Sequence, residues 1–185
     1  MSYLSQLPAE SRSSLITVFS NDIGGNSYNL YANKFDNRSR YLEKKVQDHK
    51  VENILSEIKA KKASCFLDLG ANYGEFSVPV SFHVRKLMAV EANPLLISPL
   101  DKSLREARCL NGCDTVLCNE AISRQKAKYI EFSIDPCNSS GGKEASLRID
   151  KDFNEEKKLF NIRSRVISLL DILSAFDQHD VNQGP

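Results

Sequence analysis

The chain has 185 residues, with 25 lysines and arginines against 24 aspartates and glutamates. This length suits one domain with a buried core. The charge balance disfavours a generic nucleic-acid binder, which needs a basic surface, and no apolar run reaches the roughly 20 residues that span a bilayer. The N-terminal segment lacks the basic and apolar regions of a secretory signal. We therefore expect a cytoplasmic protein that contacts neither membrane nor nucleic acid.

The five cysteines are odd in number and come without a secretory signal, so we expect no disulfide framework. Cys109, Cys113 and Cys118 lie near one another but lack the C-x2-C spacing of structural zinc, and no histidine is close to them in sequence. We interpret them as small apolar residues and predict no metal site.

The N-terminal third divides into two parts. Residues 1–39 are polar, with a strand-like piece at 15–19 and a turn-rich piece at 21–26, which predicts irregular structure and leaves a small hairpin open. From residue 40 to 62, apolar residues recur every three to five positions, which predicts an amphipathic helix. Three basic residues suit its C-terminal end: Lys59, Lys61 and Lys62. We assign residues 1–62 to an N-terminal arm and helix.

Residues 63–185 form the predicted main domain. Short apolar runs alternate there with helical patterns, and such alternation implies right-handed crossovers and a parallel sheet covered by helices on both faces. The fold class is therefore α/β. The predicted elements are a strand at 64–69, a helix at 75–85, a strand at 86–91, a helix at 95–110 and a strand at 115–118.

The last third carries weaker signals. Residues 128–134 alternate between polar and apolar, as a half-exposed antiparallel strand does. Residues 138–142 are asparagine, serine and glycine, which predicts a loop. Residues 165–176 begin like a strand and continue as a short helix.

The residues most indicative of function follow the first strand of this domain. The sequence FLDLGANYGE runs from a strand into a glycine turn, where a ligand can approach the backbone. Glu91 ends the next strand, and a carboxylate there can accept hydrogen bonds from both hydroxyls of a ribose. Each residue also has an ordinary structural interpretation, with Asp68 capping a turn, Gly70 and Gly74 shaping it, and Glu91 lying on the surface.

Two residues distinguish between ribose-containing ligands. In the dinucleotide fingerprint the second glycine lets a pyrophosphate approach the backbone. Asn72 occupies that position here, which disfavours a dinucleotide. Asp68 would repel a phosphate and suit a cation. Both favour S-adenosylmethionine (SAM), which has a sulfonium and an ammonium but no phosphate, and a nucleotide-binding oxidoreductase domain is the weaker alternative.

The segments FLDLGANYGEFS, LMAVEANP and LREARCLNGCDTVLCNEAIS resemble the FkbM-type class I SAM-dependent methyltransferases, and the resemblance extends from about Ala63 to Leu173. It implies a Rossmann-like parallel sheet and O-methylation of a hydroxyl on a small metabolite or sugar. The catalytic residues are not identified. By this resemblance, Asp68 contacts the methionine end of SAM, Glu91 holds the ribose, and Glu120 and Ala121 lie near the adenine. The full set of cofactor-binding residues that the resemblance implies is Asp68, Gly70, Ala71, Asn72, Gly74, Glu91, Ala92, Asn93, Glu120 and Ala121.

The resemblance stops near the C-terminus. Members of this family continue into further strands, and the last residues here, 174–185, do not match them. We therefore expect an incomplete sheet whose first strand, Cys65–Leu69, is an exposed edge that allows homo-oligomers to form. The alternative to an active enzyme is a non-catalytic fragment that binds SAM or another protein.

Overall fold

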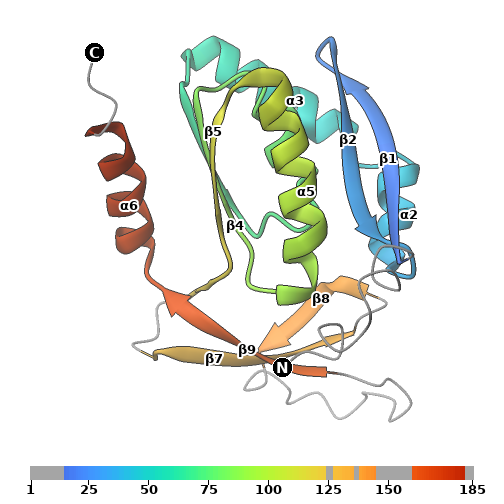
Figure 1. The fold of residues 1–185 in the computed structure, drawn as a ribbon, viewed down its shortest axis with the longest axis vertical. Coiled ribbons are helices and arrows are strands. Elements are labelled where there is room, and N and C mark those ends of the chain that lie inside the picture. Colours follow the sequence, from blue (N-terminus) through green and yellow to red (C-terminus); the bar gives the residue numbers. More distant parts are fainter. Residues whose placement is uncertain (1–14, 124–126, 136–137, 145–159, 182–185) are drawn as a thin grey trace.

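The computed structural model describes residues 15–123, 127–135, 138–144 and 160–181, drawn as a ribbon in Figure 1. Its elements are β1 (Ile16–Ile23), β2 (Asn26–Asn33), α2 (Asn37–Glu43), α3 (Asp48–Lys61), β3 (Cys65–Leu69), α4 (Ser77–Val80), β4 (Lys86–Val90), α5 (Pro94–Asn111), β5 (Asp114–Cys118), β6 (Ala121–Ile122), β7 (Tyr129–Asp135), β8 (Asn138–Glu144), β9 (Phe160–Ile167) and α6 (Leu169–Val181). None of the described helices is long and apolar enough to cross a membrane.

The centre of the fold is a parallel sheet with the strand order β3-β4-β5. β4 lies in the middle and every one of its residues is buried, which explains why its sequence is apolar without alternation. Within the described part of the chain, β3 pairs only with β4 and so forms one edge of this sheet. The predicted α/β class and its parallel sheet are confirmed.

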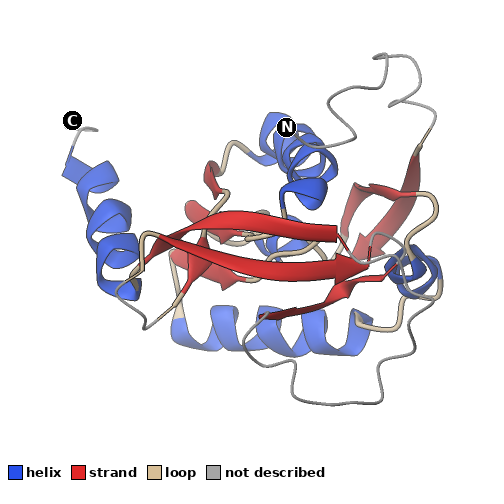
Figure 2. Ribbon diagram, turned by 90° about the horizontal axis from the view of Figure 1, so that it is seen from below, coloured by secondary structure: helices blue, strands red, loops and turns tan. Residues whose placement is uncertain are grey.

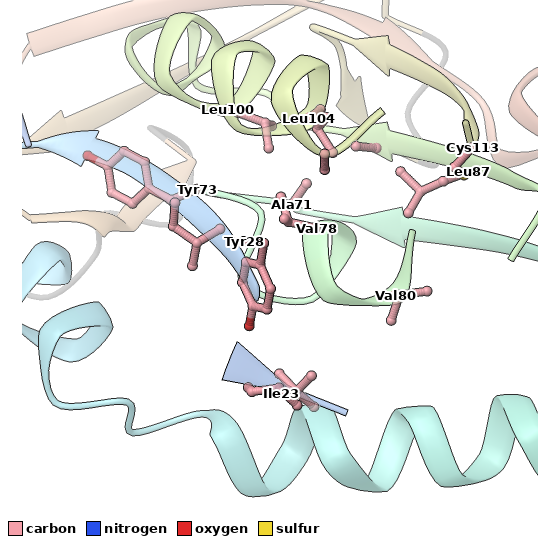
Figure 3. Packing of buried hydrophobic residues seen from close by; sticks show 14 of the residues in the cluster. Ile23, Tyr28, Ala71, Tyr73, Val78, Val80, Leu87, Leu100, Leu104 and Cys113 are labelled. Atoms are coloured by element: carbon pink, nitrogen blue, oxygen red, sulfur yellow. The ribbon is translucent and has the colours of Figure 1, made fainter. Parts of the chain in front are cut away.

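Helices cover both faces of this sheet. Leu87 and Ala89 of β4 belong to the large core that also contains residues of α3, α4, α5 and the first hairpin, and Figure 3 shows part of that packing. Met88 and Val90 point the other way and pack with Ile172 of α6. In Figure 1 the hairpin and α6 accordingly lie on opposite sides of the sheet. The two faces differ because successive side chains of a strand alternate in direction.

The structure contains an N-terminal hairpin, which the sequence pattern allowed without requiring it. β1 and β2 pair antiparallel, and the turn between them uses Gly24 and Gly25, whose φ angles are +64° and +79°. The hairpin is fixed to α5 by Tyr31, whose backbone N–H donates to Ser103 Oγ (2.9 Å) and whose hydroxyl donates to Glu106 Oε2 (2.7 Å).

The single amphipathic helix predicted over residues 40–62 is wrong in its first half. The structure has two helices, α2 and α3, separated at residues 44–47. Lys45 adopts a left-handed φ of 53°, which ends α2, and Val46 is 41% exposed although its spacing placed it on the apolar stripe. The break lets each helix direct its own apolar side chains, Leu42 and Val51, into the core.

The helix predicted over residues 75–85 is also too long, since α4 covers only Ser77–Val80. Pro79 has no N–H, and the N–H groups of Phe82 and His83 bond back only three residues, to Pro79 and Val80 (3.4 and 2.9 Å). This tightening of the backbone ends the α-helix early.

A second sheet, with the order β6-β9-β7-β8, lies at the end of the molecule where α5 begins (Figures 1 and 2). The antiparallel strand, β7, and the strand-then-helix segment, β9 and α6, confirm the predictions for the last third. The predicted loop at residues 138–142 is wrong, because these residues form β8 by pairing with β7. The pairing partner, rather than the local sequence, makes this segment a strand.

Candidate functional site

Residues 70–74 belong to the loop that joins β3 to α4, and their backbone N–H groups donate hydrogen bonds to acceptors within the chain. The N–H groups of Gly70 and Ala71 both donate to the carbonyl oxygen of Val90, at 2.8 and 3.0 Å. The N–H of Gly74 donates to the carbonyl oxygen of Ala71, at 2.8 Å. The loop is thereby closed on itself and tied to the end of β4.

The two remaining N–H groups of the loop are also used. Asn72 donates its backbone N–H to Glu91 Oε2 (2.8 Å), and Tyr73 donates to Asn72 Oδ1 (2.9 Å). Loops that hold a phosphate present unpaired N–H groups to it. Since all five N–H groups of residues 70–74 have acceptors in the chain, this loop offers no phosphate cradle.

The loop turns through left-handed backbone at Gly70 (φ +87°), Asn72 (φ 51°) and Gly74 (φ +86°). A Cβ on Gly70 would meet no atom within 4 Å, so this glycine faces open space. A Cβ on Gly74 would lie 3.0 Å from Leu100 Cδ1 and 3.0 Å from Val78 Cγ2. Gly70 therefore keeps the backbone accessible, whereas Gly74 allows α4 and α5 to pack closely.

Glu91, directly after β4, is 8% exposed and joins the loop to the start of α5. Its Oε2 accepts from the N–H of Asn72 and its Oε1 accepts from the N–H of Asn93, both at 2.8 Å. A carboxylate offers about four acceptor positions, so part of this capacity stays available for a ligand. Burial raises the pKa of Glu91, and backbone hydrogen bonds from Asn93, Asn72 and Ala92 oppose that shift.

A cavity of about 400 Å³ opens beside this loop, within the range usual for small-ligand sites. The loop and Glu91 supply one wall, and β7 supplies another through Phe132 and Ile134. It lies at the carboxyl ends of β3 and β4, where open parallel sheets hold ligands. The lining residues are Arg38, Gly70, Ala71, Asn72, Glu75, Phe76, Glu91, Ala92, Asn93, Phe132 and Ile134.

A larger cavity, of about 570 Å³, lies between the turn of the hairpin and the C-terminal end of α3. Its lining includes Gly24, Lys59, Lys62, Ala63 and His83. These residues precede the strands β3 and β4 rather than follow them, so this cavity is at the opposite end of the sheet. We place the candidate site in the smaller cavity because the buried carboxylates and the glycine turn are there.

Three buried carboxyl groups gather around the site: Asp68, Glu75 and Glu91. Burial is the main cause that raises the pKa of each, and the charge of Asp68 further raises the pKa of the other two. Arg38 counters this at Glu75, whose pKa it lowers by a hydrogen bond and by its charge, and the charge of Lys50 adds to that effect. Three carboxyl groups against one guanidinium favour a ligand that carries positive charge.

The structure brings together six of the ten residues predicted for the cofactor site. Gly70, Ala71, Asn72, Glu91, Ala92 and Asn93 all line the cavity. The other four residues are outside this lining. Asp68 lies beneath the loop and accepts from Ser77 Oγ at 2.5 Å, and Glu120 pairs with Arg165 Nε at 3.3 Å. Gly74 packs against α5, and Ala121 is buried in β6.

Sequence reasoning missed Arg38 and Glu75. Arg38 comes from α2 and donates from Nε (2.9 Å) and Nη2 to Glu75 Oε2. Glu75 directly follows the glycine loop, and a buried carboxylate there needs a cation. Both the burial of Glu75 and the identity of its partner, 37 positions earlier in the chain, are set by the tertiary structure.

A second contact fixes α2 against the loop. Asp36 caps α2 by accepting from the N–H of Arg38 (2.9 Å), and its other oxygen accepts from the hydroxyl of Tyr73 (2.6 Å). Asp36 and Tyr73 are almost fully buried, at 2% and 0% exposure. The position of Arg38 is therefore set from both sides, by the helix cap and by the ion pair.

No family model matches the sequence, and no curated protein matches it significantly. Among solved structures, the T. thermophilus 16S rRNA N2 G1207 methyltransferase (RsmC), in complex with AdoMet and guanosine, aligns with a TM-score of 0.37 and 22% identity over 57% of this chain and 28% of that chain. The M. jannaschii tRNA m1G37 methyltransferase aligns with a TM-score of 0.37 and 19% identity over 60% of this chain and 36% of that chain. This chain thus spans about a third of their length.

The names of both structures refer to RNA. They contradict the predicted partners, which were a small-molecule or carbohydrate acceptor and no nucleic acid, and we withdraw that prediction. The FkbM type, the domain boundary at residue 62 and the cytoplasmic location stay predictions.

Proposed function

We propose that this chain binds SAM in the cavity beside residues 70–74 and belongs to a SAM-dependent methyltransferase. The observation that supports this most is the combination of a loop without unpaired N–H groups and a cavity with excess buried carboxylate. Dinucleotides and nucleoside triphosphates need the opposite arrangement. SAM presents a ribose, whose hydroxyls donate hydrogen bonds to carboxylates, and a sulfonium and an ammonium, whose positive charges carboxylates attract.

Glu91 has the central role in this proposal. Its remaining acceptor capacity takes the ribose hydroxyls while Oε2 holds the N–H of Asn72 and Oε1 holds the N–H of Asn93. Gly70 lets the sugar and sulfur pass close to the backbone, because nothing lies within 4 Å of a Cβ there. Ala92 and Asn93 continue the wall from the ribose toward the base.

Methyl transfer needs no further cofactor. The acceptor nucleophile forms a bond to the methyl carbon as the carbon–sulfur bond breaks, and the electron pair of the broken bond goes to sulfur, which becomes a neutral thioether. The proton of the acceptor is released to water. The enzyme contributes chiefly by aligning the acceptor with the methyl group and excluding water. The cavity wall from β7, Phe132 and Ile134, is apolar and suits that exclusion.

A second candidate function is SAM binding without methyl transfer. It is favoured by the lining of the cavity, because among the described residues its ionisable groups are Arg38, Glu75 and Glu91, and each already bonds within the chain. In this proposal Glu91 holds the cofactor and Glu75 is paired with Arg38, so no ionisable group of the lining is dedicated to the acceptor.

Titration calorimetry with SAM, S-adenosylhomocysteine, NAD⁺ and ATP tests the ligand. The expected result is binding of the first two and no binding of the phosphate-bearing pair; binding of NAD⁺ or ATP, or no binding of SAM, contradicts the proposal. A radiolabelled-methyl assay with total RNA then separates the two functions. Incorporation of label supports the methyltransferase, and SAM binding without incorporation favours the second candidate.

A further inference from the structure

Arg38 reaches the cavity from a part of the chain distant from the SAM-binding loop. It is the one cation among the described residues that line the cavity. Its side chain is 16% exposed, and its Nε and Nη2 donate to a single oxygen, Oε2, of Glu75. No described residue accepts from Nη1, so one edge of the guanidinium is committed to Glu75 and the other still has donors.

Glu75 likewise uses only one of its two carboxylate oxygens in the ion pair. Both hydrogen bonds from Arg38 go to Oε2, and no described residue donates to Oε1. Glu75 also lines the cavity and is 7% exposed. The ion pair therefore presents a guanidinium edge with free donors next to a carboxylate oxygen with free acceptor positions.

The pair is held in place independently of any ligand. Asp36 binds the backbone of Arg38 and the hydroxyl of Tyr73, and the Arg38 guanidinium lies 5.5 Å from the centre of the Tyr41 ring. A guanidinium fixed in this way loses little conformational entropy when it binds an anion.

We propose that the Arg38–Glu75 pair binds the amino-acid end of SAM, with Arg38 on the carboxylate and Glu75 Oε1 on the ammonium; this rests on the proposed function. The charges explain why a carboxylate needs a dedicated cation here. Asp68, Glu75 and Glu91 all repel it, and Arg38 offsets them at one point. The proposal differs from the expectation that Asp68 contacts the methionine end, since Asp68 is bound to Ser77 beneath the loop.

Three ligands isolate the amino-acid end: SAM, decarboxylated SAM, which lacks the carboxylate, and methylthioadenosine, which lacks the whole amino acid. For the parent chain we expect SAM to bind roughly 10- to 100-fold more tightly than decarboxylated SAM, the value of a charge-assisted hydrogen bond. Arg38→Gln should reduce that preference to about one and leave the affinity for methylthioadenosine unchanged. Arg40→Gln, an exposed position on the same helix, is the matched control.

Arg38→Gln leaves Glu75 buried without its cation, so the double variant Arg38→Gln/Glu75→Gln provides a neutral hydrogen-bonding pair if the single variant fails to fold. It should bind methylthioadenosine like the parent and lose the preference for SAM. The inference is overturned if the parent binds SAM and decarboxylated SAM equally, or if the variants lose SAM and methylthioadenosine in equal proportion. If the parent binds none of the three ligands, the proposed function itself fails.

Discussion

Replacing Glu91 tests the site and the fold together. Glu91→Ala would remove two acceptors, for Asn72 and Asn93, at about 1.5–3 kcal/mol each for hydrogen bonds to a charged group. The sum is a large share of the roughly 5–15 kcal/mol that stabilises a typical domain. Glu91→Gln is the better variant because it keeps one acceptor oxygen and the side-chain volume.

For Glu91→Gln we expect one of the two backbone hydrogen bonds to be lost. The cost is about 1.5–3 kcal/mol, which lowers the melting temperature of a chain this long by about 3–12 °C. The remaining oxygen must still accept a backbone N–H, so the ribose loses its charge-assisted hydrogen bonds. SAM affinity should then fall roughly 30- to 100-fold.

Both effects are measured on the same samples, by thermal denaturation followed by circular dichroism and by calorimetric titration of SAM. The control is Glu57→Gln, because Glu57 is 67% exposed and forms only a surface pair with Lys61 at 3.0 Å. It should melt and bind SAM like the parent. If Glu91→Gln also kept the parent's SAM affinity, Glu91 would have no part in the cofactor site.

Three further predictions concern the loop and its surroundings. Gly74→Ala should cost about 1–3 kcal/mol more than Gly25→Ala in urea denaturation, because both have positive φ but only the Cβ at Gly74 would meet side chains at 3.0 Å; equal costs would mean the packing adjusts freely. Tyr73→Phe should lower the free energy of unfolding by about 1.5–3 kcal/mol through loss of its hydrogen bond to Asp36, and an unchanged denaturation midpoint would contradict this. Burial raises the pKa of Glu91 above 4.5. SAM affinity should weaken as the pH falls through that raised pKa, because the carboxylate that binds the ribose becomes protonated, whereas the contribution of Glu91 to folding stability is lost as the pH rises through it. Calorimetric titrations and thermal melts across that pH range should therefore show opposite trends.

The unit of strand, glycine loop and strand could be predicted because its signals are local. The apolar runs that became β3 and β4 are short and buried, and Gly70 supplies left-handed backbone at the turn. The helix α5 was equally well specified, since Asn93 caps its start and Gly112 ends it in left-handed backbone. The position of Glu91 at the end of β4 then followed from the parallel order of the strands.

What the sequence could not specify depends on contacts between distant segments. β8 is a strand because β7 pairs with it, and α2 and α3 separate because each packs its own apolar side chains into the core. The arrival of Arg38 at Glu75 has the same origin. A buried carboxylate requires a partner, but only the packing of α2 against the loop, held by Asp36 and Tyr73, decides which residue it is.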